Sequence, residues 1–241
     1  MSDSITSLAT QFRALHNLGQ EDPIDVLGLL HSLDVLTVFQ PLSKGFSGMA
    51  QITNGHRFML INTTHPLGKQ NFTICHELYH LYIQKDFTAM VCNTGLFEKK
   101  DKEEYNADCF AADLLIPQFG IIKLIPRDEI ANNRISLRTI LKIEHTYGVS
   151  RKALLHRLKV MKMIDSNRFD DFSENIVRGA AEHGYRPNLY RPTNQSLEVI
   201  GDYGDKARSK YEDGNISESH YISLLHDIGI DLDETIDDYV D

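Results

Sequence analysis

The chain has 241 residues, of which 41% are hydrophobic and 24% are charged, the balance of an ordinary globular protein. No apolar run approaches the ~20 residues that a membrane-spanning helix needs, so we expect no membrane partner. The first ten residues lack the basic and apolar regions of a signal peptide. The three cysteines have no CxxC spacing and form no disulfide framework. These features favour a cytoplasmic location.

The net charge of −9 is distributed unevenly along the chain. Residues 198–241 hold 13 acidic and 3 basic side chains. Residues 134–162 hold 8 basic side chains and one acidic side chain. The overall acidity therefore says little about partners, and each segment has to be judged separately.

The first third of the chain predicts two helices followed by a small antiparallel sheet. The apolar spacing is helical at 5–15 and 24–33, and Asp22 followed by Pro23 is typical of a helix start. Alternating and β-branched residues then predict three strands, two of which are joined by the hairpin signal Asn54-Gly55. The strands are expected at 35–39, 49–53 and 57–62.

The rest of the chain reads as mainly helical, apart from a polar segment at 85–102 without a clear pattern. Pro117 is expected to end the helix that starts at residue 103. The helices are expected at 72–84, at 103–115, as two or three short pieces within 136–163, at 202–212 and at 217–228. The sequence therefore predicts an α+β fold that is mainly helical with a small antiparallel sheet.

The helix predicted at 72–84 carries a metal-binding motif, His76-Glu77-Leu78-Tyr79-His80. The two histidines lie one helical turn apart on the same face, so both imidazoles can reach one metal ion. Glu77 does not ligate in this motif but takes a proton from the attacking water. We expect His76 and His80 to be zinc ligands and Glu77 to be the catalytic base.

A hydrolytic zinc site needs a third protein ligand and one open position. We assign Glu104 as that ligand, because Asp108 lies four residues later on the same helical face and can accept a hydrogen bond from a ligating histidine. Glu103 faces another direction and has no such partner. The competing interpretation is that Glu104 and Asp108 belong to a solvated helix face.

Two segments resemble the signatures of the ImmA/IrrE metallopeptidase family. Residues 72–81, FTICHELYHL, are similar to FTxxHELxHL, and residues 104–117, EYNADCFAADLLIP, are similar to ExxANxFAAxLLMP. Asp108 stands where the family usually has Asn, which leaves an acceptor for the histidine. The resemblance covers about residues 20–163.

The resemblance implies a minimal gluzincin-like fold in which His76, His80 and Glu104 hold the metal and Glu77 is the general base. It also implies a substrate, a helix-turn-helix transcriptional repressor encoded nearby, cleaved in phage, mobile-element or stress regulation. Zinc is the expected cofactor, and manganese is compatible with two histidines and a glutamate.

The basic segment has a Gly-Val-Ser turn at 148–150 between two short helices, the form of a helix-turn-helix element. One interpretation is DNA contact through Arg151, Lys152, Arg157 and Lys159. The other, which we favour, is a helical bundle that packs on the protease with its basic side chains in solvent.

Other candidates stay open at this point. His56, His65 and Tyr79 could each stabilise the oxyanion that peptide hydrolysis forms. Cys75 and Cys109 read as buried small side chains rather than reactive thiols.

We expect a metallopeptidase domain at 1–128, a helix-turn-helix-like segment at 129–165 and a small acidic, partly helical region at 166–241. The predicted function is zinc-dependent cleavage of a repressor. The alternative is a regulator with a non-catalytic metal site that binds DNA or sequesters a partner, as in toxin–antitoxin pairs.

Overall fold

The protein, described by a computed structural model, contains one five-stranded sheet with the strand order β4-β2-β3-β1-β5. Its strands are β1 (Val35–Gln40), β2 (Gly48–Thr53), β3 (His56–Asn62), β4 (Ala89–Cys92) and β5 (Glu198–Ile200). The β2–β3 hairpin is antiparallel, with Thr53 opposite His56, as the sequence predicts. The predicted α+β class, mainly helical with a small sheet, is confirmed, but β1 pairs in parallel with β3, so the sheet is mixed and not antiparallel throughout.

The parallel pair arises because the connection after β1 crosses over instead of forming a hairpin. The buried side chain of Asn62 holds this connection: its amide donates to the carbonyl oxygens of Ser43 and Phe46, at 2.8 and 2.7 Å. Its Oδ1 accepts a hydrogen bond from the backbone N–H of Leu42, at 2.9 Å. The crossing loop therefore places β2 on the far side of β3, where β4 adds as an edge strand.

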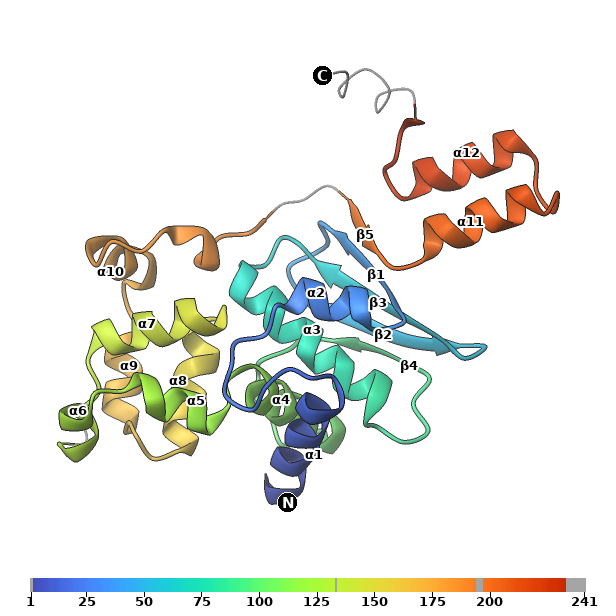
Figure 1. The fold of residues 1–241 in the computed structure, drawn as a ribbon. Coiled ribbons are helices and arrows are strands. Elements are labelled where there is room, and N and C mark those ends of the chain that lie inside the picture. Colours follow the sequence, from blue (N-terminus) through green and yellow to red (C-terminus); the bar gives the residue numbers. More distant parts are fainter. Residues whose placement is uncertain (1, 133, 194–196, 233–241) are drawn as a thin grey trace.

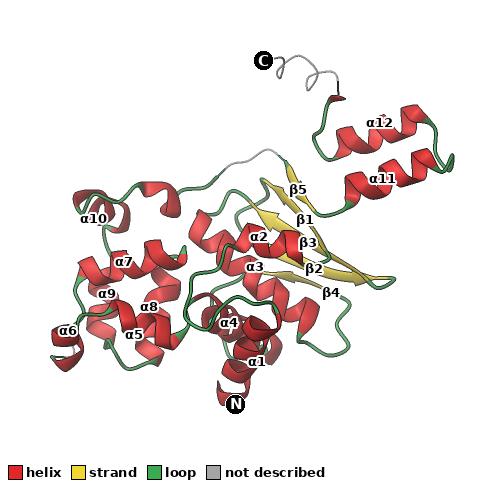
Figure 2. Ribbon diagram, in the orientation of Figure 1, coloured by secondary structure: helices red, strands yellow, loops and turns green. Residues whose placement is uncertain are grey.

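The structure describes residues 2–132, 134–193 and 197–232, and helices account for most of them. Figures 1 and 2 show α3 lying beside the sheet with α4 and α1 next to it, and α5 to α9 grouped together at one side. The α-helices are α1 (Ser2–Leu15), α2 (Val26–Ser32), α3 (Leu67–Tyr82), α4 (Lys102–Leu115), α5 (Gln118–Leu124), α6 (Arg127–Ala131), α7 (Leu137–Tyr147), α8 (Arg151–Val160), α9 (Ser166–Ser173), α10 (Ile176–Glu182), α11 (Tyr203–Glu212) and α12 (Glu218–Asp227), and η1 (Pro187–Tyr190) is a 3₁₀ helix. Among these residues, no helix is both long and apolar enough to cross a bilayer.

The predicted start of α2 was wrong. The cap is Asp25, whose side chain accepts a hydrogen bond from the N–H of Gly28 at 3.1 Å. Asp22 instead offers its backbone carbonyl to the buried guanidinium of Arg13. The carbonyls of Gly19 and Leu114 also accept hydrogen bonds from Arg13, so this arginine ties the α1–α2 connection to the end of α4.

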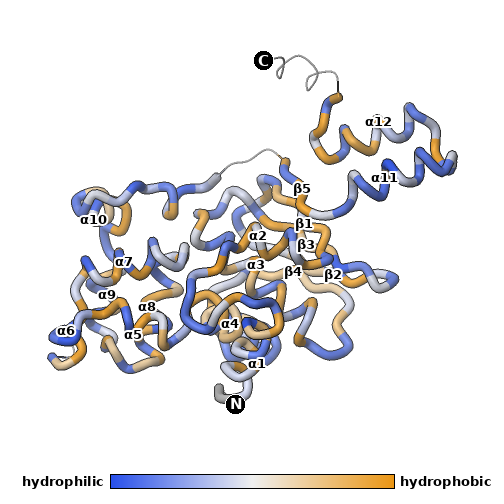
Figure 3. The backbone as a smooth tube through the Cα atoms, in the orientation of Figure 1, coloured by the Kyte–Doolittle hydropathy of each residue, from blue (hydrophilic) through white to orange (hydrophobic). Residues whose placement is uncertain are grey.

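One continuous hydrophobic core joins α1, α3, α4, α7 and α8 to the sheet. In Figure 3 the strands are largely hydrophobic, whereas α11 is largely hydrophilic. The hairpin of α11 and α12 extends from β5 at the far end of the sheet (Figure 1). This hairpin belongs to the predicted acidic region, of which residues 194–196 and 233–241 lie outside the described part of the chain.

The turn between α7 and α8 packs directly on the first turn of α3. A Cβ atom added to the buried Gly68 would lie 2.7 Å from Ser150 N and 2.8 Å from the carbonyl carbon of Val149. The side chain of Asn71 donates a hydrogen bond to the carbonyl oxygen of Gly148, at 2.8 Å. The helix-turn-helix-like segment therefore rests on the helix that carries the metal-binding motif.

We predict that Gly68→Ala destabilises the protein by about 1–3 kcal/mol, because the new methyl group meets backbone atoms that cannot move aside. The effect should be visible in urea unfolding, although alanine is the better helix former by ~1 kcal/mol. Gly179→Ala in α10 is the matched control, since its Cβ would have only an ordinary contact of 3.6 Å with Leu137. Equal stability changes in the two variants would contradict the close packing.

Candidate metal centre

The catalytic motif lies in the second half of α3, which is buried along most of its length. His76 and His80 are fully buried, and their Nε2 atoms point to the same place, 3.2 Å apart. Glu77 is also fully buried. The structure therefore brings the two histidines together as the helical spacing requires.

Glu104 reaches the two histidines from α4, which packs against α3. Its Oε2 lies 3.4 Å from His76 Nε2, and its Oε1 lies 3.1 Å from His80 Nε2. Asp101 caps α4 by accepting hydrogen bonds from the N–H groups of Glu103 and Glu104. Glu104 is thus in the first turn of a helix, where the helix dipole favours a carboxylate.

Glu103 points away from the two histidines. Its carboxylate is engaged elsewhere: the hydroxyl of Tyr79 donates a hydrogen bond to Glu103 Oε2 at 2.7 Å. This bond also occupies the hydroxyl of Tyr79. His56 is exposed at the start of β3, and His65 Nε2 lies 3.0 Å from the carbonyl oxygen of Phe46. None of the three oxyanion candidates has its polar group at the histidine pair in this structure.

The remaining ring nitrogen of each histidine is held by an acceptor. His76 Nδ1 donates to Asp108 Oδ1 at 2.9 Å, the contact that the helical register predicts. Asp108 also accepts hydrogen bonds from the backbone N–H groups of Gly95 and Phe97, at 2.9 and 2.8 Å. It therefore fixes both the orientation of His76 and the loop that follows β4.

The partner of His80 is Gln84, a residue that was not predicted; its Oε1 lies 2.5 Å from His80 Nδ1. The sequence does contain a signal for this contact. Gln84 follows His80 by four residues, and Ile83, the residue that caps the end of α3, keeps helical backbone angles. With both Nδ1 atoms occupied, both Nε2 atoms face the shared point between the two rings.

Asp108→Ala should lower the affinity for the metal by about 10–100-fold, because the ring of His76 loses the acceptor that orients it. Asp108→Asn is the matched control, since its amide oxygen can still accept the hydrogen bond and it should lose less affinity. Competition for zinc with a chromophoric chelator measures both variants. An unchanged affinity in Asp108→Ala would exclude an orienting role.

The pKa values of His76 and Glu104 are shifted in the directions expected of a site that can accept a cation. Burial lowers the pKa of His76, but hydrogen bonds to Asp108 and Glu104 outweigh it and raise the pKa to about 10. Burial also opposes ionisation of Glu104, yet the two histidines hold its pKa well below the usual range. Without a metal, the imidazole of His76 therefore retains a proton beside the ionised Glu104, and a cation can replace that positive charge.

Glu77 has the environment of a catalytic base. Burial raises its pKa to about 7, and the neighbouring histidines offset part of that rise. Its Oε1 has no hydrogen-bond partner among the described residues. A Cβ at Gly48 would come within 2.7 Å of this oxygen, so the glycine lets β2 pass close to the carboxylate.

Cys92, at the end of β4, is the fourth donor in the cluster. One ligand atom each from His76, His80, Cys92 and Glu104 all lie within 4.8 Å of one another. Burial and the carboxylates of Glu77 and Glu104 raise the pKa of the thiol, so it is protonated when no cation is present. Cys92 was not predicted as a site residue, because the polar segment around it has no strand pattern.

The predicted DNA contacts are divided between the interior and the surface. Arg151 is buried and forms an ion pair with Glu144, and Arg157 is largely buried and forms an ion pair with Asp113. The favoured interpretation, a packing bundle, fits the structure, but these two guanidinium groups are used inside the fold and face neither solvent nor DNA. Lys152 and Lys159 are exposed.

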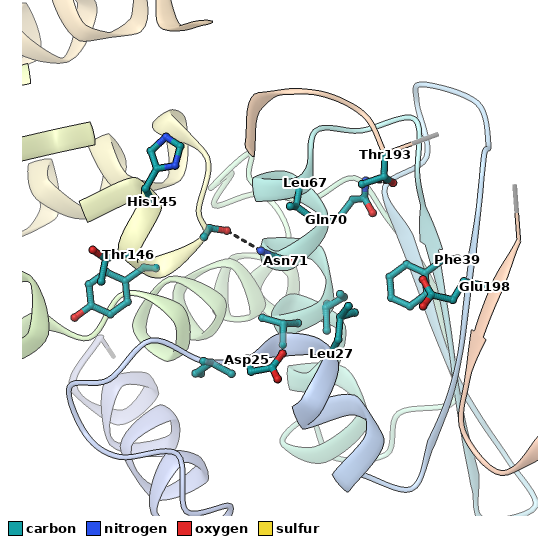
Figure 4. Close-up of a pocket in the computed structure, with 15 residues that line it drawn as sticks. Asp25, Leu27, Phe39, Leu67, Gln70, Asn71, His145, Thr146, Thr193 and Glu198 are labelled. Carbon is teal, nitrogen blue, oxygen red and sulfur yellow. Dashed lines mark hydrogen bonds between the residues drawn. The ribbon is translucent and has the colours of Figure 1, made fainter. Parts of the chain in front are cut away.

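A pocket of about 330 Å³ lies away from the cluster, between α2, the N-terminal half of α3 and α7 (Figure 4). Its two central polar side chains already donate hydrogen bonds to other protein groups. Gln70 donates to the carbonyl oxygen of His65 and to the hydroxyl of Thr193, and Asn71 holds the α7–α8 turn. Their hydrogen bonds stabilise the surrounding loops, so the cluster on α3 and α4 is the better candidate for chemistry.

Comparison with known families supports this choice. Residues 31–159, more than half of the chain, match the peptidase M78 family model, described as the IrrE N-terminal-like domain. The chain belongs to this family. The matched range contains the two histidines, Glu77, Glu104 and Asp108, and the family supports a metallopeptidase role. No curated protein matches the chain closely enough to be informative.

The IrrE-like match also extends across α7 and α8. These helices were predicted as a separate segment from residue 129, and they pack on α3 and α4 in the same core. The division at 128 and 165 stays a prediction.

Proposed function

We propose that this metallopeptidase is a zinc-dependent endopeptidase whose substrate is a helix-turn-helix repressor encoded nearby. The observation that carries the zinc assignment is the spacing of three donor groups. Tetrahedral zinc with bonds of about 2.0–2.1 Å to nitrogen and oxygen places its ligands about 3.3 Å apart. His76 Nε2 and His80 Nε2 are 3.2 Å apart, and one oxygen of the Glu104 carboxylate approaches each of them, Oε2 at 3.4 Å from His76 and Oε1 at 3.1 Å from His80.

His76, His80 and Glu104 would hold the metal in this proposal. When bound, the metal supplies Lewis-acid chemistry, polarising the scissile carbonyl group and acidifying water. Glu77 is the group that moves the proton: its carboxylate accepts one from the attacking water and passes it to the leaving amine. Burial of Glu77 without a partner for Oε1 supports this role, since the oxygen is unoccupied and close to the ligands.

An extended peptide has a place to bind beside the cluster. β4 is an edge strand that ends at Cys92, and the side chain of Val91 next to it is 63% exposed. Exposed edges accept an additional strand through backbone hydrogen bonds. A strand that adds to β4 would be an internal stretch of the substrate chain, and this favours cleavage by an endopeptidase over removal of terminal residues. The repressor as substrate rests on the resemblance of the two signatures.

The test is to incubate the purified protein with the helix-turn-helix protein encoded next to it, with zinc and separately with manganese. Mass spectrometry should find two complementary fragments of the repressor, and they should be absent with Glu77→Gln. An intact repressor in a stable complex would favour the sequestering alternative. A salt-sensitive DNA shift without cleavage would favour a DNA-binding regulator, which the burial of Arg151 and Arg157 argues against.

A further inference from the structure

Cys92 lies where a fourth metal ligand would be. Its Sγ is 3.5 Å from Glu104 Oε1 and 3.8 Å from His80 Nε2. In a tetrahedral site with a zinc–sulfur bond of about 2.3 Å, a sulfur ligand lies about 3.6 Å from a nitrogen or oxygen ligand. The side chain is 2% exposed, so it faces the cluster rather than solvent.

The same sulfur atom lies beside the catalytic base. Cys92 Sγ is 3.7 Å from Glu77 Oε2. The attacking water has to lie between the carboxylate of Glu77 and the metal. Sγ is therefore in the space that this water needs.

The backbone on both sides holds Cys92 in this place. Cys92 pairs with Gly48 of β2, and its carbonyl oxygen accepts a hydrogen bond from Ser47 N at 3.0 Å. The loop that follows is fixed by Asp108, through the N–H groups of Gly95 and Phe97. One residue, Asp108, thus positions His76 and the loop that leads away from Cys92.

We propose that Cys92 is the fourth metal ligand of the resting protein and keeps the site closed. The inference rests on the proposed function, because it requires a metal at His76, His80 and Glu104. A bound cation deprotonates a coordinating thiol outright. Closed four-ligand sites are structural, whereas catalytic sites keep one position for water.

Activation then requires Sγ to leave. The thiolate would take up a proton from solvent as it dissociates, and a water molecule would occupy its place beside Glu77. β4 is suited to this change, because it is four residues long and pairs only with β2 within the described sheet. A peptide that adds to the outer edge of β4 is the natural trigger, since it acts on the strand that carries Cys92.

The first experiment replaces zinc with Co²⁺ in the full-length protein and records its absorption spectrum. We expect a thiolate-to-cobalt charge-transfer band in the wild type and in Cys109→Ser, and loss of the band in Cys92→Ser. Zinc affinity of Cys92→Ser should fall at least about tenfold, as measured with a chromophoric chelator. Cys109 is the matched control because it lies on the ligand-bearing helix α4, away from the cluster.

X-ray absorption of the zinc-loaded wild type shows whether a sulfur atom binds the metal, even if Cys92→Ser fails to fold. One sulfur at about 2.3 Å supports the proposal. A shell of nitrogen and oxygen alone overturns it. With a folded variant, Cys92→Ser should cleave the repressor faster than the wild type, and an equal or slower rate overturns the closed resting state.

Failure of the proposed function would look different. If zinc and Co²⁺ do not bind, or if they bind equally well to His76→Ala, the three-ligand site itself is wrong. If the metal binds through His76, His80 and Glu104 without sulfur, the site stands and only the role of Cys92 is lost.

Discussion

Replacing Glu77 with glutamine should leave the metal in place and lower the rate of peptide cleavage by about 10²–10⁴-fold, the usual contribution of a general acid–base group. Glutamine has nearly the same shape as glutamate but cannot accept the proton of the attacking water. The carboxylate lies beside the ligand atoms without being one of the three that approach one another at 3.1–3.4 Å. Catalysis should therefore fail while metal binding persists.

The measurement needs metal content and rate from the same preparation. Zinc per chain in Glu77→Gln should equal that of the wild type, whereas His80→Ala should lose zinc as well as activity. Comparing the two variants separates loss of the base from loss of the metal. A wild-type rate in Glu77→Gln would refute the assignment of Glu77 as the base and the mechanism built on it.

The predicted α3 and α4 depend on local features, which is why the sequence places α4 within one residue and finds the motif-bearing part of α3, although α3 starts at Leu67 and not at residue 72. Apolar periodicity and the spacing of His76 and His80 are properties of a single helix. Glu104 and Asp108 lie one turn apart on the next helix, so the relation between them could also be read from the sequence. Their approach to the histidines depends on packing, and only the structure shows it.

The parallel pairing of β1 with β3 depends on contacts distant in sequence. The sequence shows a hairpin at Asn54-Gly55. It gives no sign that the buried side chain of Asn62 will hold the loop between β1 and β2. The strand β4 was missed for a related reason. Its four residues become a strand by pairing with β2, and without that pairing Cys92 cannot be placed near the histidines.

Charge alone misled the interpretation of the basic segment. Eight basic residues suggested a solvated or DNA-facing surface, but charge does not say which helix face a residue occupies. Glu144 is the one acidic residue in that segment, and it is the partner of Arg151. A lone acid seven residues before an arginine, across a turn, was the available sign that the pair is internal.

The buried pair of Glu144 and Arg151 leads to the second large effect that we expect. Arg151→Ala should destabilise the protein by about 3–5 kcal/mol, because it leaves the carboxylate of Glu144 buried without its counter-charge. Arg151 also donates to the carbonyl oxygen of Phe172 at 2.9 Å, and Tyr190 donates to Glu144 at 2.7 Å. The pair therefore joins α7 and α8 to α9 and η1, and urea unfolding should report the loss.

Two further variants distinguish this structural role from a role in DNA contact. Lys152→Ala changes an exposed neighbouring cation and should alter stability by no more than about 0.5 kcal/mol. Replacing both partners, as in Glu144→Leu with Arg151→Met, should cost less than Arg151→Ala alone, because no unpaired charge is left inside. If Arg151→Ala were as stable as the wild type, the buried ion pair would be refuted, and Arg151 would again be a candidate for binding DNA.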